Sequence, residues 1–180
     1  ATLRGGAGML QYRDKTAPPE QRHAEAQALR QLCHQYAVPL IINDDIELAR
    51  AVAADGVHLG GTDASPASAR AVLGPQAIIG ISGYNNAEAA RNPEADYIAF
   101  GRLCPSATKP EAPAANLEVF SRARAITQQP LVGIGGINAD NAQWVMDAGA
   151  DWLAVVAAVF AADDIETATQ QLCQCMAQRL

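Results

Sequence analysis

The chain has 180 residues and a net charge of −6, with 49% apolar and only 5% aromatic residues. Its acidic balance argues against nucleic acid as the main partner, because nucleic-acid binding calls for a basic face. No secretory signal is present and no apolar run approaches the roughly 20 residues that span a bilayer, so no membrane partner is expected. The four cysteines are expected to be free, reduced thiols in a cytoplasmic protein.

Strand-like and helix-like segments alternate along the chain. Short apolar runs bounded by turn residues predict strands, and segments with helical spacing predict helices. The strands are expected at 9–12, 39–43, 57–59, 77–82, 97–100, 131–134 and 152–156. The helices are expected at 19–36, 46–53, 66–73, 86–91, 117–126, 139–148 and 164–180. This alternation predicts an α/β protein built on a parallel sheet.

A weak internal repeat marks the turns that lead into the predicted strands. Its copies are Gly6-Ala7-Gly8, Ala54-Asp55-Gly56, Glu94-Ala95-Asp96 and Gly149-Ala150-Asp151. Seven repeated strand–helix units favour a (β/α)₈ TIM barrel that is one strand short. Because residues 1–6 look like the tail of a helix, we expect one N-terminally incomplete barrel domain over residues 1–180.

The missing first strand would leave an unpaired gap between residues 9–12 and 152–156. Free strand edges invite association, so a homo-oligomer is one expected form of the protein. The alternative fold is a doubly wound open sheet, which usually carries a Gly-rich turn after its first strand. No G-x-G-x-x-G occurs in this chain, which favours the barrel.

Polar residues follow the predicted strands at the carboxyl ends, where barrels of this type carry their active face. In chain order they are Gln11, Arg13, Lys15, Asn43, Asp44, Asp45, Asp63, Ser82, Ser106, Thr108, Lys109, Gly135 and Gly136. Gathering cations and carboxylates on one face is costly unless a ligand uses both signs. A diphosphate with a divalent metal does so, since cations bind phosphate oxygens and carboxylates bind the metal.

Three acidic residues separate into two roles. Asp44 and Asp63 follow neighbouring strands, which lie about 4.8 Å apart, so their carboxylates would repel each other without a shared cation. Mg²⁺ is the natural cation, because it takes a few carboxylates, water and substrate phosphates. Asp45 directly precedes a predicted helix and fits a helix cap better than a metal ligand.

The remaining candidates carry signals of different strength. Alternation along the first strand points Gln11 and Arg13 the same way, into the barrel mouth. The hydroxyls and ammonium of residues 106–109 suit pyrophosphate oxygens, although an ordinary polar loop is the alternative. Gly135-Gly136 before a helix would let backbone N–H groups approach a phosphate. His58, inside a predicted strand, is expected to be a buried, hydrogen-bonded structural residue.

As a set, these motifs resemble the thiamine-phosphate synthase family. The matching pieces, in the family's order, are Gln11-Tyr12-Arg13-Asp14-Lys15, Ile42-Asn43-Asp44, Gly56-Val57-His58-Leu59-Gly60 with Asp63, Ser82, Pro105-Ser106-Ala107-Thr108-Lys109 and Ile134-Gly135-Gly136-Ile137. The resemblance implies a (β/α)₈ barrel and a transferase of thiamine biosynthesis. Such an enzyme joins 4-amino-2-methyl-5-pyrimidinylmethyl diphosphate to a thiazole phosphate and releases pyrophosphate.

The resemblance also implies a role for each residue. Asp44 and Asp63 would bind Mg²⁺, and Lys109, Arg13 and Ser82 would be the catalytic residues. The residues implied to bind the two substrates are Gln11, Arg13, Lys15, Asn43, Ser82, Ser106, Thr108, Lys109, Gly135 and Gly136, of which the two glycines serve the thiazole phosphate.

One departure from the family concerns the last predicted strand. The family usually carries serine in a Val-Ser-Ala run, whereas this chain reads Val156-Ala157-Ala158, without that hydroxyl. Two other functions stay open from the sequence: a thiazole tautomerase, which need not bind a metal, and a non-catalytic barrel that binds phosphate ligands. The predicted pair of Asp44 and Asp63 favours the synthase.

Overall fold

The computed structural model describes residues 1–105 and 114–177 of the chain. Their strands form one parallel sheet whose spatial order follows the sequence from β1 to β7. The strands are β1 (Leu10–Tyr12), β2 (Leu40–Asn43), β3 (Gly56–Leu59), β4 (Ile78–Tyr84), β5 (Tyr97–Phe100), β6 (Leu131–Ile134) and β7 (Trp152–Ala154). All seven predicted strands are therefore present.

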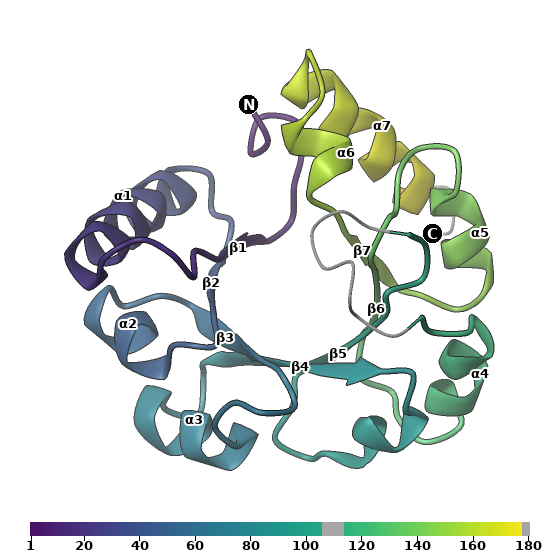
Figure 1. Cartoon of the computed structure of the whole chain (residues 1–180), viewed down its shortest axis with the longest axis horizontal. Coiled ribbons are helices and arrows are strands. Elements are labelled where there is room, and N and C mark those ends of the chain that lie inside the picture. Colours follow the sequence, from purple (N-terminus) through teal and green to yellow (C-terminus); the bar gives the residue numbers. More distant parts are fainter. Residues whose placement is uncertain (106–113, 178–180) are drawn as a thin grey trace.

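The helices lie on the outside of the curled sheet, as Figure 1 shows. They are α1 (Pro19–Gln35), α2 (Ile46–Ala51), α3 (Pro66–Leu73), η1 (Ala87–Arg91), α4 (Glu118–Arg124), α5 (Ala142–Asp147), α6 (Ala157–Phe160) and α7 (Ile165–Ala177). None of the described helices is both long and apolar enough to cross a membrane.

The strand order and the placement of the helices confirm a TIM-barrel-like fold and exclude the doubly wound open sheet. An open sheet would carry helices on both faces, whereas here they cover only the outer face (Figure 1). Within the described part of the chain, β1 pairs only with β2 and β7 pairs only with β6. The predicted gap between the first and last strands is therefore confirmed.

Successive strand residues face alternately outward to the helices and inward to the barrel. On the outer face, apolar residues such as Ile42, Val57 and Ile98 pack in buried clusters with residues of the helices and the loops beside them. On the inner face, Tyr97 packs with Ala99 and Val132 in a separate cluster. The strands β2, β3 and β5 are buried along their whole length, as expected for a sheet covered on both faces.

The internal repeat has a structural cause at the amino-terminal edge of the sheet. Asp55, Asp96 and Asp151 each stand just before a strand. Their side chains accept a backbone N–H at the start of the preceding strand, from Leu40, Ile79 and Leu131 at 2.8, 2.7 and 2.7 Å respectively. Each carboxylate also pairs with an arginine of the outer layer; the three arginines are Arg30, Arg70 and Arg124. The repeated aspartate thus fixes adjacent strands to each other and to a helix.

Candidate functional site

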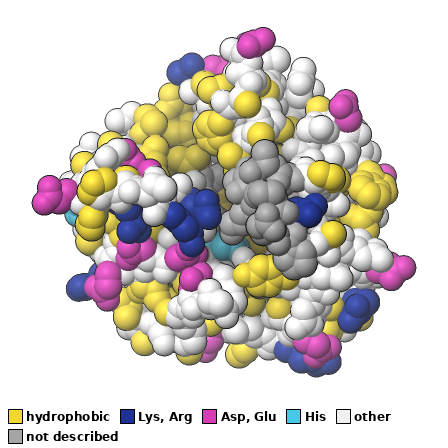
Figure 2. Space-filling view, in the orientation of Figure 1, with side chains coloured by type: hydrophobic (Ala, Val, Ile, Leu, Met, Phe, Trp, Pro, Cys, Tyr) yellow, Lys and Arg dark blue, Asp and Glu magenta, His cyan; other side chains and the backbone are white. Residues whose placement is uncertain are grey.

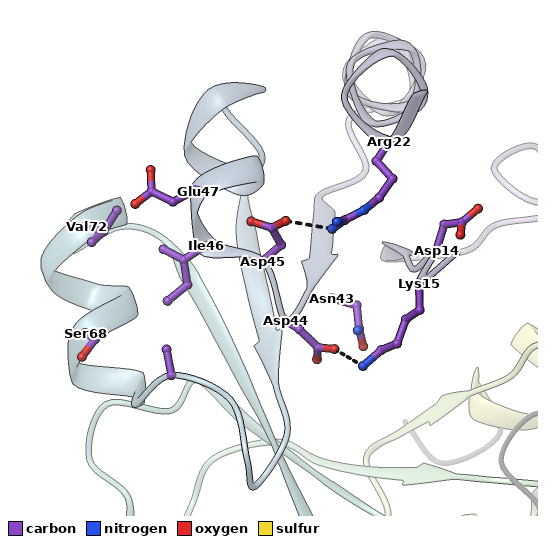
Figure 3. Close-up of a pocket in the computed structure, with 11 residues that line it drawn as sticks. Asp14, Lys15, Arg22, Asn43, Asp44, Asp45, Ile46, Glu47, Ser68 and Val72 are labelled. Carbon is purple, nitrogen blue, oxygen red and sulfur yellow. Dashed lines mark hydrogen bonds and ion pairs between the residues drawn. The ribbon is translucent and has the colours of Figure 1, made fainter. Parts of the chain in front are cut away.

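The carboxyl end of β2 presents an acidic side chain paired with a lysine. Lys15 Nζ lies 2.6 Å from Asp44 Oδ2; the lysine comes from the segment between β1 and α1, the aspartate follows β2, and their side chains point toward each other (Figure 3). The lysine side chain is 55% exposed and the aspartate 25% exposed, so both can meet a ligand from solution. Basic and acidic side chains lie next to each other near the middle of the face shown in Figure 2. A cation and an anion are thus placed together at the mouth.

Asp44 is held in an uncommon backbone conformation. Its φ is +66°, and its N–H donates to the carbonyl oxygen of His58 on β3 at 2.8 Å. Left-handed conformations are unfavourable for most residues and gather at functional sites, although aspartate tolerates them better than most. The backbone therefore fixes the direction in which this carboxylate leaves the strand.

Asp63 belongs to the same electrostatic group. Burial alone would raise the pKa of Asp44. The contact with Lys15 and its charge, with Asp63 and Asn43 close by, instead bring that pKa below its usual value. Asp63 Oδ2 accepts the backbone N–H of Gly60 at 2.6 Å, which fixes its direction. The structure thus brings together two carboxylates that follow neighbouring strands.

This pair fits a divalent cation that is shared with a ligand. In the part of the chain that the structure describes, no group of three or more His, Cys, Asp or Glu side chains forms a metal site. Two carboxylates are a sparse cage for Mg²⁺, which in proteins commonly takes one or two carboxylates and fills its other positions with water and substrate phosphate. Asp44 and Asp63 are therefore suited to hold Mg²⁺ together with a diphosphate.

Asp45 takes the role of a helix cap, as predicted. Its Oδ1 accepts the N–H of Leu48 at 2.9 Å, and its Oδ2 pairs with Nη2 of Arg22 at 2.8 Å (Figure 3). These contacts hold the start of α2 against α1. Both oxygens of Asp45 are thereby engaged in the scaffold, next to the carboxylate of Asp44 at the mouth.

Ser82 on β4 belongs to a chain of polar side chains inside the barrel. Its Oγ lies 3.0 Å from Nε2 of His58, and Nδ1 of the same imidazole lies 3.0 Å from Oη of Tyr97. Burial raises the pKa of the Tyr97 hydroxyl, and a hydrogen bond with the side chain of Gln11 opposes that rise. His58 is thus a buried, hydrogen-bonded residue, as expected from the sequence.

The end of β6 is shaped by two glycines with positive φ, +95° at Gly135 and +66° at Gly136. A Cβ at Gly135 would lie 2.4 Å from Cβ of Arg102, and one at Gly136 would lie 2.4 Å from the carbonyl oxygen of Pro105. Both conformation and space therefore require glycine here. The helix predicted to follow at 139 begins only at Ala142, so these N–H groups do not lie at a helix N-terminus.

The structure places most of the predicted site residues on one face of the barrel. Arg13 is exposed just after β1, and Asn43 is buried at the end of β2. Ser106, Thr108 and Lys109 lie outside the described residues. Tyr97 is not among the predicted site residues, because its strand reads as an apolar run in the sequence. Alternation along that strand would have pointed this hydroxyl into the barrel.

The fold and site together define a class: a (β/α)-barrel protein that gathers side chains of both charges at its strand ends. The family model for thiamine monophosphate synthase matches residues 1–159. The chain therefore belongs to the thiamine monophosphate synthase family.

Three relatives show the extent of this similarity. The chain is 57% identical over 159 residues to the thiamine-phosphate synthase of Azoarcus sp. (strain BH72), covering 87% of this chain and 77% of the relative. It is 51% identical over 177 residues to that of Methylobacillus flagellatus, covering 97% and 84%. A solved thiamine phosphate pyrophosphorylase from Pyrococcus furiosus superposes with a TM-score of 0.90 at 36% identity, covering 99% of this chain and 87% of that one.

Proposed function

We propose that this protein is a transferase of thiamine biosynthesis. It joins 4-amino-2-methyl-5-pyrimidinylmethyl diphosphate to a thiazole phosphate and releases pyrophosphate. The observation that carries the proposal is the group formed by Lys15, Asp44 and Asp63 at the strand ends, since it offers both signs of charge to a diphosphate and its cation. Family membership and the names of the relatives agree with this reaction.

The roles of the residues follow from their chemistry. Gln11 and Asn43 recognise the pyrimidine diphosphate, while Arg13, Lys15 and Lys109 bind its phosphate oxygens. Asp44 and Asp63 hold Mg²⁺, which when bound neutralises charge on the diphosphate. Ser82, Ser106 and Thr108 donate hydrogen bonds to the departing pyrophosphate, and the backbone at Gly135 and Gly136 receives the thiazole phosphate. Both glycines have positive φ and lack a side chain, which allows a phosphate to approach the backbone closely.

The chemical step needs charge stabilisation more than a protein nucleophile. The bond between the methylene carbon and the diphosphate oxygen breaks, and the electron-rich aminopyrimidine stabilises the positive charge left on carbon. The electron pair of the broken bond leaves with the pyrophosphate, and the positive charges of Arg13, Lys15 and Lys109 stabilise its growing negative charge. The thiazole nitrogen then donates its lone pair to the carbon, which forms the new carbon–nitrogen bond.

Supplying both substrates with and without Mg²⁺ tests this function. We expect release of pyrophosphate and formation of thiamine phosphate, in equal amounts and only when both substrates and Mg²⁺ are present. Titration calorimetry of each substrate separates the alternatives. Binding without turnover would support a non-catalytic barrel, and metal-independent isomerisation of a thiazole carboxylate phosphate would support a tautomerase.

Position 157, where the family usually has serine, yields a prediction about the second substrate. Ala157 is exposed at the start of α6, which begins shortly after β7. Strand β7 neighbours β6, whose end carries the two glycines. One neutral hydrogen bond is worth about 0.5–1.5 kcal/mol, or up to roughly tenfold in affinity. We expect Ala157→Ser to lower KM for the thiazole phosphate up to that extent, without changing KM for the pyrimidine diphosphate.

Steady-state kinetics with each substrate varied in turn measures this effect. Ala161→Ser, also exposed but at the other end of α6, is the matched control and should leave both constants unchanged. If Ala157→Ser binds the thiazole phosphate no better than the original chain, then residue 157 does not face that phosphate.

A further inference from the structure

The inner face of the barrel carries one continuous path of polar side chains that joins two separate parts of the candidate site. Its hydrogen bonds run from Tyr97 on β5 through His58 on β3 to Ser82 on β4, and the side chain of Gln11 on β1 acts on the Tyr97 hydroxyl. Tyr97 and His58 are only 5% and 7% exposed, so both side chains are buried inside the barrel. In the proposed function, Gln11 contacts the pyrimidine and Ser82 contacts the diphosphate.

The path is built into the packing of the barrel. The ring of Tyr97 crosses β4 at Gly80, where a Cβ would lie only 2.0 Å from the ring carbon Cζ. The same ring stacks on the imidazole of His58, with centroids 5.5 Å apart and an interplanar angle of 28°. Trp152 contacts the ring from β7, with centroids 6.2 Å apart. The position of the hydroxyl is therefore set by several strands.

The number of hydrogens available in the path determines which group donates in each hydrogen bond. If Ser82 uses its single hydroxyl hydrogen for a phosphate oxygen, Ser82 Oγ must accept from Nε2–H of His58. The Nδ1 atom of that neutral imidazole is then an acceptor, so the Tyr97 hydroxyl must donate to it. With its hydrogen used in this way, the Tyr97 oxygen can only accept, so a hydrogen bond from Gln11 must come through its amide nitrogen.

We propose that Tyr97 and His58 are positioning residues, which turn the amide oxygen of Gln11 and the hydroxyl hydrogen of Ser82 toward the bound pyrimidine diphosphate. This inference rests on the proposed function. The oxygen of Gln11 is then an acceptor for the amino group of the pyrimidine, and it disfavours a ring that carries an acceptor at the same place. Selection of the amino group is thereby coupled to the contact between Ser82 and the diphosphate.

The first test needs neither substrate nor activity. The chain contains three histidines, and His23 and His34 are exposed on α1. The double variant His23→Gln/His34→Gln therefore leaves His58 as the only imidazole. Nitrogen-15 NMR at alkaline pH should then show the Nε2–H tautomer, and adding Tyr97→Phe should move the Nδ1 resonance. The Nδ1–H tautomer would overturn the proposal, whether or not the protein is active.

The second test compares the pyrimidine diphosphate with an analogue that has an oxo group in place of the amino group. The original chain should strongly prefer the amino compound in kcat/KM. Tyr97→Phe should keep the ring packing but lower that preference roughly tenfold. The side-chain amide of Gln11 can then rotate and exchange the positions of its oxygen and nitrogen. The matched control is Tyr12→Phe, since this tyrosine of β1 faces outward and its hydroxyl donates to Glu25 at 2.7 Å.

The outcomes separate this proposal from the proposed function. An equal loss of kcat/KM for both compounds in Tyr97→Phe would reduce the tyrosine to a packing role and contradict the inference. An original chain that neither binds nor converts the pyrimidine diphosphate, although His58 shows the expected tautomer, would contradict the proposed function and leave the order of the hydrogen bonds supported.

Discussion

Replacing Asp63 by asparagine is expected to lower kcat by roughly 10²-fold, because the variant keeps the shape of the side chain but loses the charge that holds the cation. An amide oxygen can still accept the N–H of Gly60, so the local turn and the melting temperature should change little. The activity that remains should require much more Mg²⁺. The measurement is kcat as a function of Mg²⁺ concentration, with pyrophosphate release as the signal.

Asp14→Asn is the matched control for this change. Asp14 also lines the hollow beside Lys15, but its Oδ1 accepts hydrogen bonds within its own turn, from the N–H groups of Thr16 and Ala17 at 2.7 and 2.9 Å. An asparagine can make the same contacts, so this variant should keep its activity and its Mg²⁺ dependence. An Asp63→Asn enzyme with the same turnover and Mg²⁺ requirement as the original would remove Asp63 from the cation site.

The second large effect is expected on stability, at the opposite edge of the sheet. Asp96→Ala removes the acceptor of the Ile79 N–H and the partner of Arg70 at the same time. Because Ile79 is fully buried, an unsatisfied N–H there costs about 1–3 kcal/mol of the free energy of unfolding. For a chain of this length, 2 kcal/mol corresponds to a decrease of roughly 4–8 °C in Tm.

Thermal and urea unfolding measure this loss. The melting temperature of Asp96→Asn should lie between those of the original chain and Asp96→Ala. Its amide oxygen can still accept from Ile79, whereas the charge beside Arg70 is gone. The control is Asp147→Ala, whose carboxylate makes an exposed contact with Gln143 on the surface of α5. If Asp96→Ala and Asp147→Ala unfold at the same temperature, the aspartates before the strands do not fix the sheet.

Local patterns were enough to predict the strands, because each strand is a short apolar run between turn residues. The helix ends were harder to predict. Helix α5 begins at Ala142, three residues later than expected, because the side chain of Asn138 accepts the N–H groups of Asp140 and Asn141 and forms a turn first. Helix α6 was missed because its apolar residues continue those of β7 without a glycine or proline between them.

In the site, too, residues marked by a local pattern were predicted, whereas a residue whose role depends on distant parts of the chain was not. Charges after strands revealed Asp44 and Asp63, because the topology of a parallel barrel gathers strand ends on one face. The role of Tyr97 depends on Gly80 in the neighbouring strand and on His58 one strand further, residues 17 and 39 positions away in the chain. Alternation within the strand can place the hydroxyl inside the barrel, but it cannot reveal these distant partners, so Tyr97 was left out of the candidate site.

The unequal pairing of the strands has a consequence for local opening of the structure. In the described part of the chain, β2 to β6 each have two neighbours, whereas β1 and β7 each have one. Amide hydrogens in β3 to β5 should therefore exchange most slowly with solvent, and protection should decrease toward both edges. Gln11 lies in the edge strand β1 while Ser82 lies in the central strand β4, so a ligand that contacts both would link an edge to the centre. Saturation with the pyrimidine diphosphate should then slow exchange in β1 far more than in β4.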